Sequence, residues 1–270
     1  MRLLLIRHGE TVDNVAGNFA GVTDSALTAH GVLQAERLGA HLAARFPTSI
    51  RAIFTSDLQR AHRTGEAVRS AVGRAASGGI VAPAAAAAAA RIPLQTTPLL
   101  RERDFGPLEG AAFRACKLNV EDVAETVASM QARARRFLVD VLLPHMRHGD
   151  GTGPDDVYVV VAHGLLLPKI YACLMDRVPR GKFTLDAALM RDPGAPPLQP
   201  WWSNTAYLEL ILRQLAPDGR PGGGPLRMHV LQVNCKVHLQ DLRRTRGGIG
   251  SAPHDDKQRR IESYFGGKKL

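Results

Sequence analysis

The stretch Leu3-Leu4-Leu5-Ile6-Arg7-His8-Gly9-Glu10-Thr11 joins an apolar run directly to a polar one. Four successive apolar residues predict a strand that is buried on both faces of a sheet. Residues that follow the strands of an open parallel sheet line the crevice in which ligands bind. We therefore expect His8 to contact a ligand, because the strand would hold it in place, and Gly9 to let the backbone approach that ligand closely.

Strand and helix patterns alternate along the rest of the chain. Leu33, Leu38, Leu42 and Phe46 recur at near-helical spacing and predict a helix over 28–46, whose first turn Thr28 would cap. The other expected helices are 56–72, 122–145 (with core candidates Val123, Val127, Met130, Phe137 and Leu138) and 165–175, and the other expected strands are 50–54, 157–161, 206–212 and 228–233. This order favours an α/β fold, a three-layer α/β/α sandwich with a mainly parallel central sheet.

The expected strands end in residues that suit a phosphate group. Arg7 and His8 follow the first strand, Arg60 lies one turn into the helix after the second, and His163 follows the strand over 157–161. Arg forks bind phosphate oxygens bidentately, and a neutral His nitrogen can attack phosphorus. A single His after a strand is more often structural or solvated, but several strand ends that share one sheet edge favour a phosphate pocket.

Glu102, within the stretch Leu100-Arg101-Glu102-Arg103-Asp104-Phe105-Gly106, offers the acid that such chemistry needs. Phosphoryl transfer from an alkoxide leaving group requires a general acid. An isolated Glu is more often a solvated surface charge. Beside a pocket, however, burial and a departing dianion would both raise its pKa and keep it protonated.

Composition excludes several classes of protein. The three cysteines, Cys116, Cys173 and Cys235, lie far apart, which rules out a disulfide scaffold and argues against a cysteine-based zinc site. No apolar run is long enough for a signal peptide or a membrane span, so we expect a cytoplasmic or nuclear protein without a membrane partner. The 270 residues carry a formal charge of +10, which we assign to an anionic small substrate and a basic tail rather than to direct nucleic-acid binding.

Together these motifs resemble the histidine phosphatase superfamily, which has the phosphoglycerate-mutase-like fold. The resemblance spans most of residues 1–235 in the family's order. Its elements are residues 5–11 with Asn14, Leu27 and Thr28 with Gly31, residues 55–61 with Thr64, residues 100–102 with Phe105, Gly106, Glu109 and Gly110, residues 161–164, and Asn204 with Thr205. The fold that the resemblance implies agrees with the sandwich expected from the strand and helix patterns.

The resemblance implies a catalytic role for five residues. His8 would be the nucleophile that becomes phosphohistidine, and Arg7, Arg60 and His163 would bind the phosphoryl oxygens. Glu102 would protonate the leaving oxygen and then activate the water that hydrolyses phosphohistidine. Arg and His supply the positive charge in this scheme, so it implies neither a metal nor a cofactor.

Three further residues fall where family members contact phosphate or substrate: Asn14, Gly21 and Thr23. Within the superfamily, residues 100–110 look most like the TIGAR-type fructose-2,6-bisphosphatase branch, and Glu125-Thr126 followed by Arg133 suits that branch. The resemblance therefore implies a metal-independent phosphatase for a small phosphorylated metabolite, such as a sugar phosphate or bisphosphate. A phosphoglycerate-type mutase is the alternative, but the short segment between Gly110 and Glu125 favours an open, hydrolysing pocket.

The composition changes twice along the chain. Residues 75–91 include seven successive alanines and are expected to form a low-complexity insertion in a histidine phosphatase domain over 1–235. Residues 236–270 hold nine Lys and Arg against four Asp and Glu, a local charge of +5, and are expected to form a basic C-terminal tail.

The stretch Gln258-Arg259-Arg260-Ile261-Glu262-Ser263-Tyr264-Phe265 in this tail resembles the peptide motif that docks on the sliding clamp of DNA replication. Ile261, Tyr264 and Phe265 would form an apolar plug on one turn of 3₁₀ helix, with Gln258 in a polar pocket. Short patterns also recur by chance, and the alternatives are a solvated tail or one folded back onto the domain. A third hypothesis is that the whole chain serves as an adaptor for the clamp.

Overall fold

A seven-stranded sheet forms the centre of the molecule in the computed structural model, which describes residues 1–76, 91–146, 155–190, 198–215, 224–244 and 248–255. The strands are β1 (Arg2–Arg7), β2 (Ile50–Ser56), β3 (Leu94–Thr97), β4 (Val157–Ala162), β5 (Phe183–Leu185), β6 (Tyr207–Gln214) and β7 (Leu226–Cys235). They lie in the order β3-β2-β4-β1-β6-β7-β5. The first four in this order are parallel, β6 is antiparallel to β1 and β7, and β5 is parallel to β7. The expected mainly parallel sheet is confirmed.

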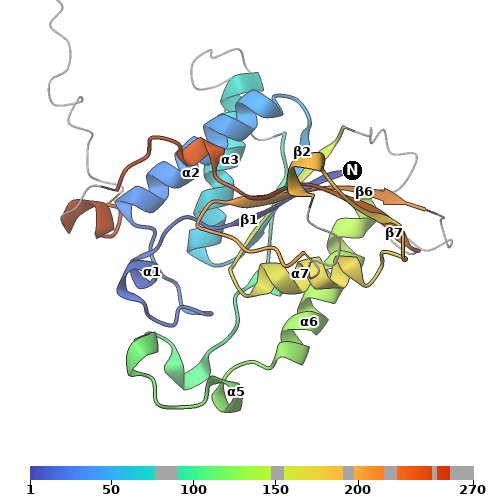
Figure 1. The fold of residues 1–270 in the computed structure, drawn as a ribbon. Coiled ribbons are helices and arrows are strands. Elements are labelled where there is room, and N and C mark those ends of the chain that lie inside the picture. Colours follow the sequence, from blue (N-terminus) through green and yellow to red (C-terminus); the bar gives the residue numbers. More distant parts are fainter. Residues whose placement is uncertain (77–90, 147–154, 191–197, 216–223, 245–247, 256–270) are drawn as a thin grey trace, which may run out of the picture.

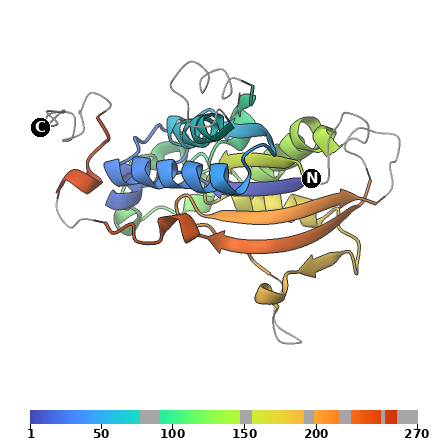
Figure 2. The ribbon, with the colours of Figure 1, turned by 90° about the horizontal axis from the view of Figure 1, so that it is seen from above.

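Helices cover both faces of this sheet (Figures 1 and 2). One face carries α2 (Ala29–Arg45) and α3 (Gln59–Ala76), and the other carries α6 (Val127–Arg136) and α7 (Leu166–Met175). The shorter elements are α1 (Val12–Ala16), α5 (Val120–Val123), a π-helical stretch η4 (Phe137–Leu142), and the 3₁₀ turns η1 (Pro98–Leu100), η2 (Gly106–Leu108), η3 (Phe113–Ala115), η5 (Leu143–Met146), η6 (Ala187–Leu189), η7 (Val237–Leu239) and η8 (Gly248–Ser251). The architecture is the expected α/β/α sandwich.

The four apolar residues of β1 divide between the two faces. Leu3 and Leu5 belong to the core under α6 and α7, whereas Leu4 and Ile6 belong to the core under α2 and α3. All four are fully buried, because successive side chains of a strand point to opposite faces and β1 has a neighbour on each side. The strand predicted from the opening stretch is therefore confirmed, and it holds Arg7 and His8 at the carboxyl edge of the parallel strands.

The helix expected over 28–46 is confirmed with one exception on its apolar side. Thr28 caps α2, since its hydroxyl accepts the Gly31 amide at 2.9 Å. Leu38 and Leu42 are fully buried, but Leu33 is 45% exposed. Leu33 precedes Leu38 by five residues, which turns it about 140° around the helix and away from the sheet.

The helix expected over 122–145 is confirmed from Val127 onward, where α6 continues directly into η4 and η5, but its start is wrong, because the chain breaks between α5 and α6. Ala124 ends α5 in an extended conformation, and Thr126 begins α6 with a new cap, its hydroxyl accepting the Ser129 amide. Met130, Phe137 and Leu138 are buried as expected, but Val127 is exposed and Val123 only partly buried. β3 and β5 escape the sequence patterns because runs of four and three residues are too short to show alternation.

The chain beyond Cys235 returns to the α2 side of the molecule, where η7 and η8 pack (Figure 1). His238 is buried, and residues 252–254 exchange backbone hydrogen bonds with residues 27–29. Packing thus continues past the change in composition at residue 236. The domain boundary stays a prediction, and both the alanine-rich stretch over 77–90 and the proposed clamp motif lie outside the described residues. None of the helices among the described residues is long and apolar enough to cross a membrane.

Candidate active site

His8 lies directly after β1 and is almost fully buried. Its Nδ1 is 2.7 Å from the carbonyl oxygen of Gly9, and because a carbonyl can only accept, Nδ1 must carry the proton. Burial, followed by the charges of Arg60 and Arg7, lowers the pKa of His8 well below its ordinary value. His8 is therefore a neutral imidazole whose Nε2 keeps its lone pair, which is the form that can act as a nucleophile.

His163 meets His8 because their strands are neighbours. β1 and β4 pair in parallel with Arg7 opposite Ala162, so the residues that follow, His8 and His163, reach the same sheet edge. The centroids of their rings are 5.0 Å apart. The Nε of Arg60 donates to Nδ1 of His163 at 3.3 Å. Burial and the charge of Arg60 lower the pKa of His163 well below its ordinary value. His163 is thus neutral, and its remaining proton lies on Nε2.

Two buried donors at this edge have no hydrogen-bond acceptor among the described residues: Nε2 of His163 and Nε of Arg7. The Arg7 guanidinium is fixed nearby by its NH1, which donates to the Trp202 carbonyl at 3.1 Å. A buried donor without a partner costs free energy on the order of 1–3 kcal/mol, so such groups in native proteins need an explanation. An anionic ligand would supply acceptors for such donors.

Glu102 is buried beside these groups, on the segment between η1 and η2. One carboxyl oxygen accepts the backbone amide of Arg103 and the other accepts that of Leu165, each at 2.9 Å. Burial raises the pKa of Glu102 above its ordinary value, although the two amides and the charges of Arg60 and Arg7 oppose the shift. Burial therefore favours the protonated form of this side chain, which is the form that a proton donor needs.

Arg60 has a second set of partners that the sequence does not indicate. Its terminal nitrogens donate to the carbonyl oxygens of Ala20, Gly21 and Thr23, at 3.2, 2.5 and 2.8 Å. The amides of Gly21 and Thr23 in turn donate to the carboxylate of Glu109, both at 3.1 Å. Gly21 and Thr23 therefore lie at the site, where their polar backbone groups join the loop to Arg60 and Glu109. A phosphate contact by Arg60 stays a prediction.

Asn14 lies at the exposed rim of the site. Its side-chain oxygen accepts the amide of Asn204 at 3.0 Å, and the same Asn204 amide nitrogen also donates to the His8 carbonyl at 3.1 Å. The backbone amide of Thr205, a residue in the left-handed region at φ 55°, donates to the Arg7 carbonyl at 3.0 Å. The predicted contact residue Asn14 is thus tied to the loop that carries His8.

Several residues that support the site have no predicted role. The hydroxyl of Thr64 accepts the Gly9 amide at 3.1 Å and donates to the Arg60 carbonyl at 2.7 Å, joining α3 to the His8 loop. Thr64, Glu109 and Asn204 stand within the motifs of the resemblance, so that signal could have found them. Trp202, whose indole donates to the Leu5 carbonyl at 2.8 Å, gives no such signal.

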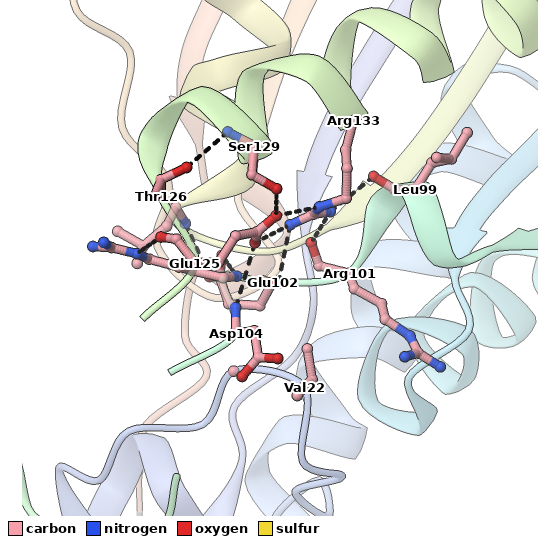
Figure 3. Close-up of polar contacts among 12 residues, drawn as sticks. Val22, Leu99, Arg101, Glu102, Asp104, Glu125, Thr126, Ser129 and Arg133 are labelled. Atoms are coloured by element: carbon pink, nitrogen blue, oxygen red, sulfur yellow. Dashed lines mark hydrogen bonds and ion pairs between the residues drawn. The ribbon is translucent and has the colours of Figure 1, made fainter. Parts of the chain in front are cut away.

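A cleft of about 490 Å³ opens beside Glu102. It is lined by Val22, Pro98, Arg101, Glu102, Asp104, Gly106, Val123, Ala124, Glu125, Ser129 and Arg133. Figure 3 shows Val22 on one side of this region, across from Glu125 and Ser129 on the other. Within the described part of the chain, no group of three or more His, Cys, Asp or Glu is arranged to hold a metal ion.

Comparison with known proteins places these residues in a family context. The model of the histidine phosphatase superfamily (branch 1) matches residues 3–77, which include Arg7, His8 and Arg60. A probable phosphatase of Schizosaccharomyces pombe is 30% identical over 270 residues, covering 97% of this chain and 78% of the relative. A 2,3-bisphosphoglycerate-dependent phosphoglycerate mutase of Azorhizobium caulinodans is 29% identical over 217 residues, covering 80% of this chain and 84% of the relative.

Solved structures share the fold at lower identity. A mycobacterial glucosyl-3-phosphoglycerate phosphatase in complex with VO₃ superimposes with a TM-score of 0.59 at 20% identity, covering 86% of this chain and 98% of its own. A phosphoserine phosphatase mutant of Entamoeba histolytica in complex with phosphoserine gives a TM-score of 0.56 at 19% identity, covering 88% and 98% of the two chains. These similarities establish the fold.

Proposed function

Because this chain belongs to the histidine phosphatase superfamily, we propose that it hydrolyses a small phosphorylated metabolite through a phosphohistidine on His8. The observation that carries the proposal is the meeting of three features at one edge of the sheet. His8 is a neutral imidazole with a free Nε2, two buried donors face no acceptor among the described residues, and Glu102 is a buried carboxyl with a raised pKa. A phosphate monoester would engage all three.

In the first step, the Nε2 lone pair of His8 attacks phosphorus and the bond between phosphorus and the leaving oxygen breaks. Glu102 gives its proton to that oxygen, so the product leaves as an alcohol. Arg7 and His163 donate hydrogen bonds to phosphoryl oxygens, where negative charge must be stabilised. Because these donors are held in place before the substrate binds, they stabilise the transition state without reorganising.

In the second step, a water molecule attacks the phosphohistidine. Glu102, now a carboxylate, accepts the water proton, and the bond between phosphorus and His8 Nε2 breaks. Inorganic phosphate leaves, His8 returns to its neutral form, and Glu102 is again protonated. One carboxyl group thus serves as acid and then as base, which requires a pKa near the working pH, and the raised pKa of Glu102 supports this role.

The cleft beside Glu102 would hold the rest of the substrate. Its wall combines carboxylates, guanidinium groups and a hydroxyl with only a few apolar side chains, a lining that suits a hydrophilic molecule such as a sugar phosphate. The glucosyl-3-phosphoglycerate and phosphoserine phosphatases that share the fold act on small hydrophilic phosphates. Assignment to the TIGAR-type branch stays a prediction.

A phosphoglycerate-type mutase is the second candidate, because mutases also stand among the relatives. A mutase keeps its phosphohistidine from water and returns the phosphoryl group to an acceptor. The two activities differ in their products, so one experiment separates them.

The test is a panel of sugar phosphates, bisphosphates, phosphoserine and phosphoglycerates, with the products identified by ³¹P NMR. We expect stoichiometric inorganic phosphate from at least one compound. Isomerised phosphoglycerate without free phosphate would instead establish the mutase, and turnover of no compound by the folded protein would overturn the proposal.

A further inference from the structure

The segment that carries Glu102 has little regular structure of its own. Between η1, which ends at Leu100, and η2, which begins at Gly106, residues 101–105 form neither helix nor strand. The backbone carbonyls of a strand would be fixed by a neighbouring strand. Something else must fix the carbonyls here, because the position of the Glu102 carboxyl depends on this backbone.

Arg133, from α6, fills that place (Figure 3). Its NH1 donates to the carbonyl oxygens of Leu99 and Arg101 at 3.1 and 3.0 Å, and its NH2 donates to that of Glu102 at 3.2 Å. One guanidinium thus binds three carbonyls within four residues. The planar fork of Arg, with its five fixed N–H groups, suits such a set of acceptors, whereas the single ammonium of Lys does not.

Glu125 holds the guanidinium from the other side. Its two carboxylate oxygens accept Nε and NH2 of Arg133 at 2.8 and 2.7 Å, a bidentate pair. The Ser129 hydroxyl donates to the same carboxylate at 2.7 Å, and the backbone amide of Glu125 donates to the Asp104 carbonyl at 2.7 Å. Each of the five N–H groups of Arg133 therefore has an acceptor. Arg133 and the Glu125 backbone together bind the carbonyls of the segment that carries Glu102.

We propose that Arg133, oriented by Glu125, is a positioning residue for the Glu102 carboxyl, so that losing it impairs reactions that need a proton on the leaving oxygen. The inference rests on the proposed role of Glu102 as proton donor. Arg133 lines the cleft beside Glu102, but all five of its N–H groups donate to backbone carbonyls or to Glu125, so none is left to bind the substrate. Its effect should therefore depend on the leaving group.

The experiment compares two substrates by rapid quench, measuring the rate at which phosphoenzyme forms. p-Nitrophenyl phosphate has a stable leaving group that needs little protonation. The glycerol of glycerol phosphate, in contrast, would leave as an alkoxide unless its oxygen is protonated. The variants are Glu102→Gln, Arg133→Met, Arg133→Lys and Glu125→Gln. The matched control is Arg136→Met, three residues along the same helix and largely exposed. Thermal unfolding midpoints identify variants that fail to fold.

We expect Arg133→Met to slow the reaction of glycerol phosphate by about 10- to 100-fold and that of p-nitrophenyl phosphate by less than about threefold. General acid catalysis is worth about 10²- to 10⁴-fold, so Glu102→Gln should show the same selectivity in stronger form. Arg133→Lys should fall nearly as far as Arg133→Met, because the three N–H groups of one ammonium cannot serve both Glu125 oxygens and three carbonyls at once. Glu125→Gln should show a smaller selective loss, and Arg136→Met none.

A double variant tests most directly whether Arg133 acts through Glu102. If Arg133 acts through Glu102, adding Arg133→Met to Glu102→Gln should cost no further activity on glycerol phosphate, because residues that act as a unit are not additive. If the double variant instead shows the product of the two single losses, or if Arg133→Met slows both substrates equally, the inference is overturned while the role of Glu102 stays intact. If Glu102→Gln itself is not selective, the proton-donor role fails, and the positioning role fails with it.

Discussion

Nε of Arg60 donates to Nδ1 of His163 across 3.3 Å, and this one contact decides which nitrogen of His163 carries its proton. An accepting Nδ1 leaves the proton on Nε2, and that atom is buried without an acceptor among the described residues. Because the Arg60 guanidinium always keeps its protons, Nδ1 of His163 must accept from it. His163 therefore stays neutral and can donate through Nε2. The site is in this way prepared for an anion before one binds.

Replacing His163 by Ala should lower kcat/KM by about 10²- to 10³-fold, which is the usual cost of removing one preorganised donor to a developing negative charge. The same variant should bind vanadate more weakly. His62→Ala, on the exposed side of α3, is the matched control and should be unchanged. A loss below about threefold for His163→Ala would show that Nε2 does not contact the phosphoryl group.

Activity should persist on the acid side of neutrality. His8 attacks as the neutral imidazole, and its pKa is lowered well below its ordinary value, so it stays neutral as pH falls through about 6.5, where a free histidine takes up a proton. Phosphoenzyme formation from an aryl phosphate, measured at pH 5 to 8, reports this directly. A rate that halves near pH 6.5 and follows a simple histidine titration would contradict the lowered pKa.

The fall in rate at high pH should arise from deprotonation of Glu102. This residue must be protonated to donate, and its pKa is raised, so the rate with an alkyl phosphate is full below that pKa and falls as pH rises through it. Glu102→Gln should remove this limb along with most of the rate. A basic limb that persists unchanged in Glu102→Gln would assign the titration to another group.

Strand patterns predicted the centre of the site because its geometry follows from the order of the strands. His8 and His163 each follow a strand, and the two strands are parallel neighbours in the sheet. Both side chains therefore reach the same sheet edge, as their positions after strands in the sequence predicted. The other partners of Arg60 could not be predicted in this way, since its contacts with the carbonyls of residues 20–23 depend on the path of a loop that has no periodicity.

The break between α5 and α6 shows a second limit of the sequence patterns. Apolar residues continue at helical spacing through the break, while a cap at Thr126 restarts the chain in a new direction. This restart brings Glu125 and Arg133 against the Glu102 segment. A local capping signal therefore overrode the hydrophobic period, and the supporting contacts of the site followed from it.

Truncation should separate the two parts of the C-terminal region. The His238 ring, buried beside α2, is 3.1 Å from the Thr205 hydroxyl, and the backbone amide of Thr205 donates to the carbonyls of Arg7 and His8. A chain ending at residue 235 should therefore lose thermal stability and activity. A chain ending at residue 255 should keep both, as measured by the unfolding midpoint and phosphate release. Equal activity of the two truncations would contradict a supporting role for η7.

The clamp motif is tested by calorimetry with a peptide of residues 255–270 and a purified replication clamp. If the motif docks on the clamp, binding should be saturable and should disappear when Tyr264 and Phe265 are replaced by Ala, because the two aromatics supply most of the apolar plug. The absence of any heat of binding at about 100 μM would rule out the clamp as a partner of this peptide. Catalysis by the chain that ends at residue 255 would show that the two functions are separable.

The proposed reaction passes through a covalent phosphohistidine on His8, and acid-labile labelling detects this intermediate. Protein quenched in alkali during turnover of a ³²P-labelled phosphate monoester should carry label that is stable in base and lost in acid, with stoichiometry approaching one per chain. His8→Ala should carry no label, and its turnover should be slower by about 10³-fold or more. Hydrolysis by His8→Ala at the rate of the unaltered protein, or label that survives acid, would contradict a phosphohistidine on His8.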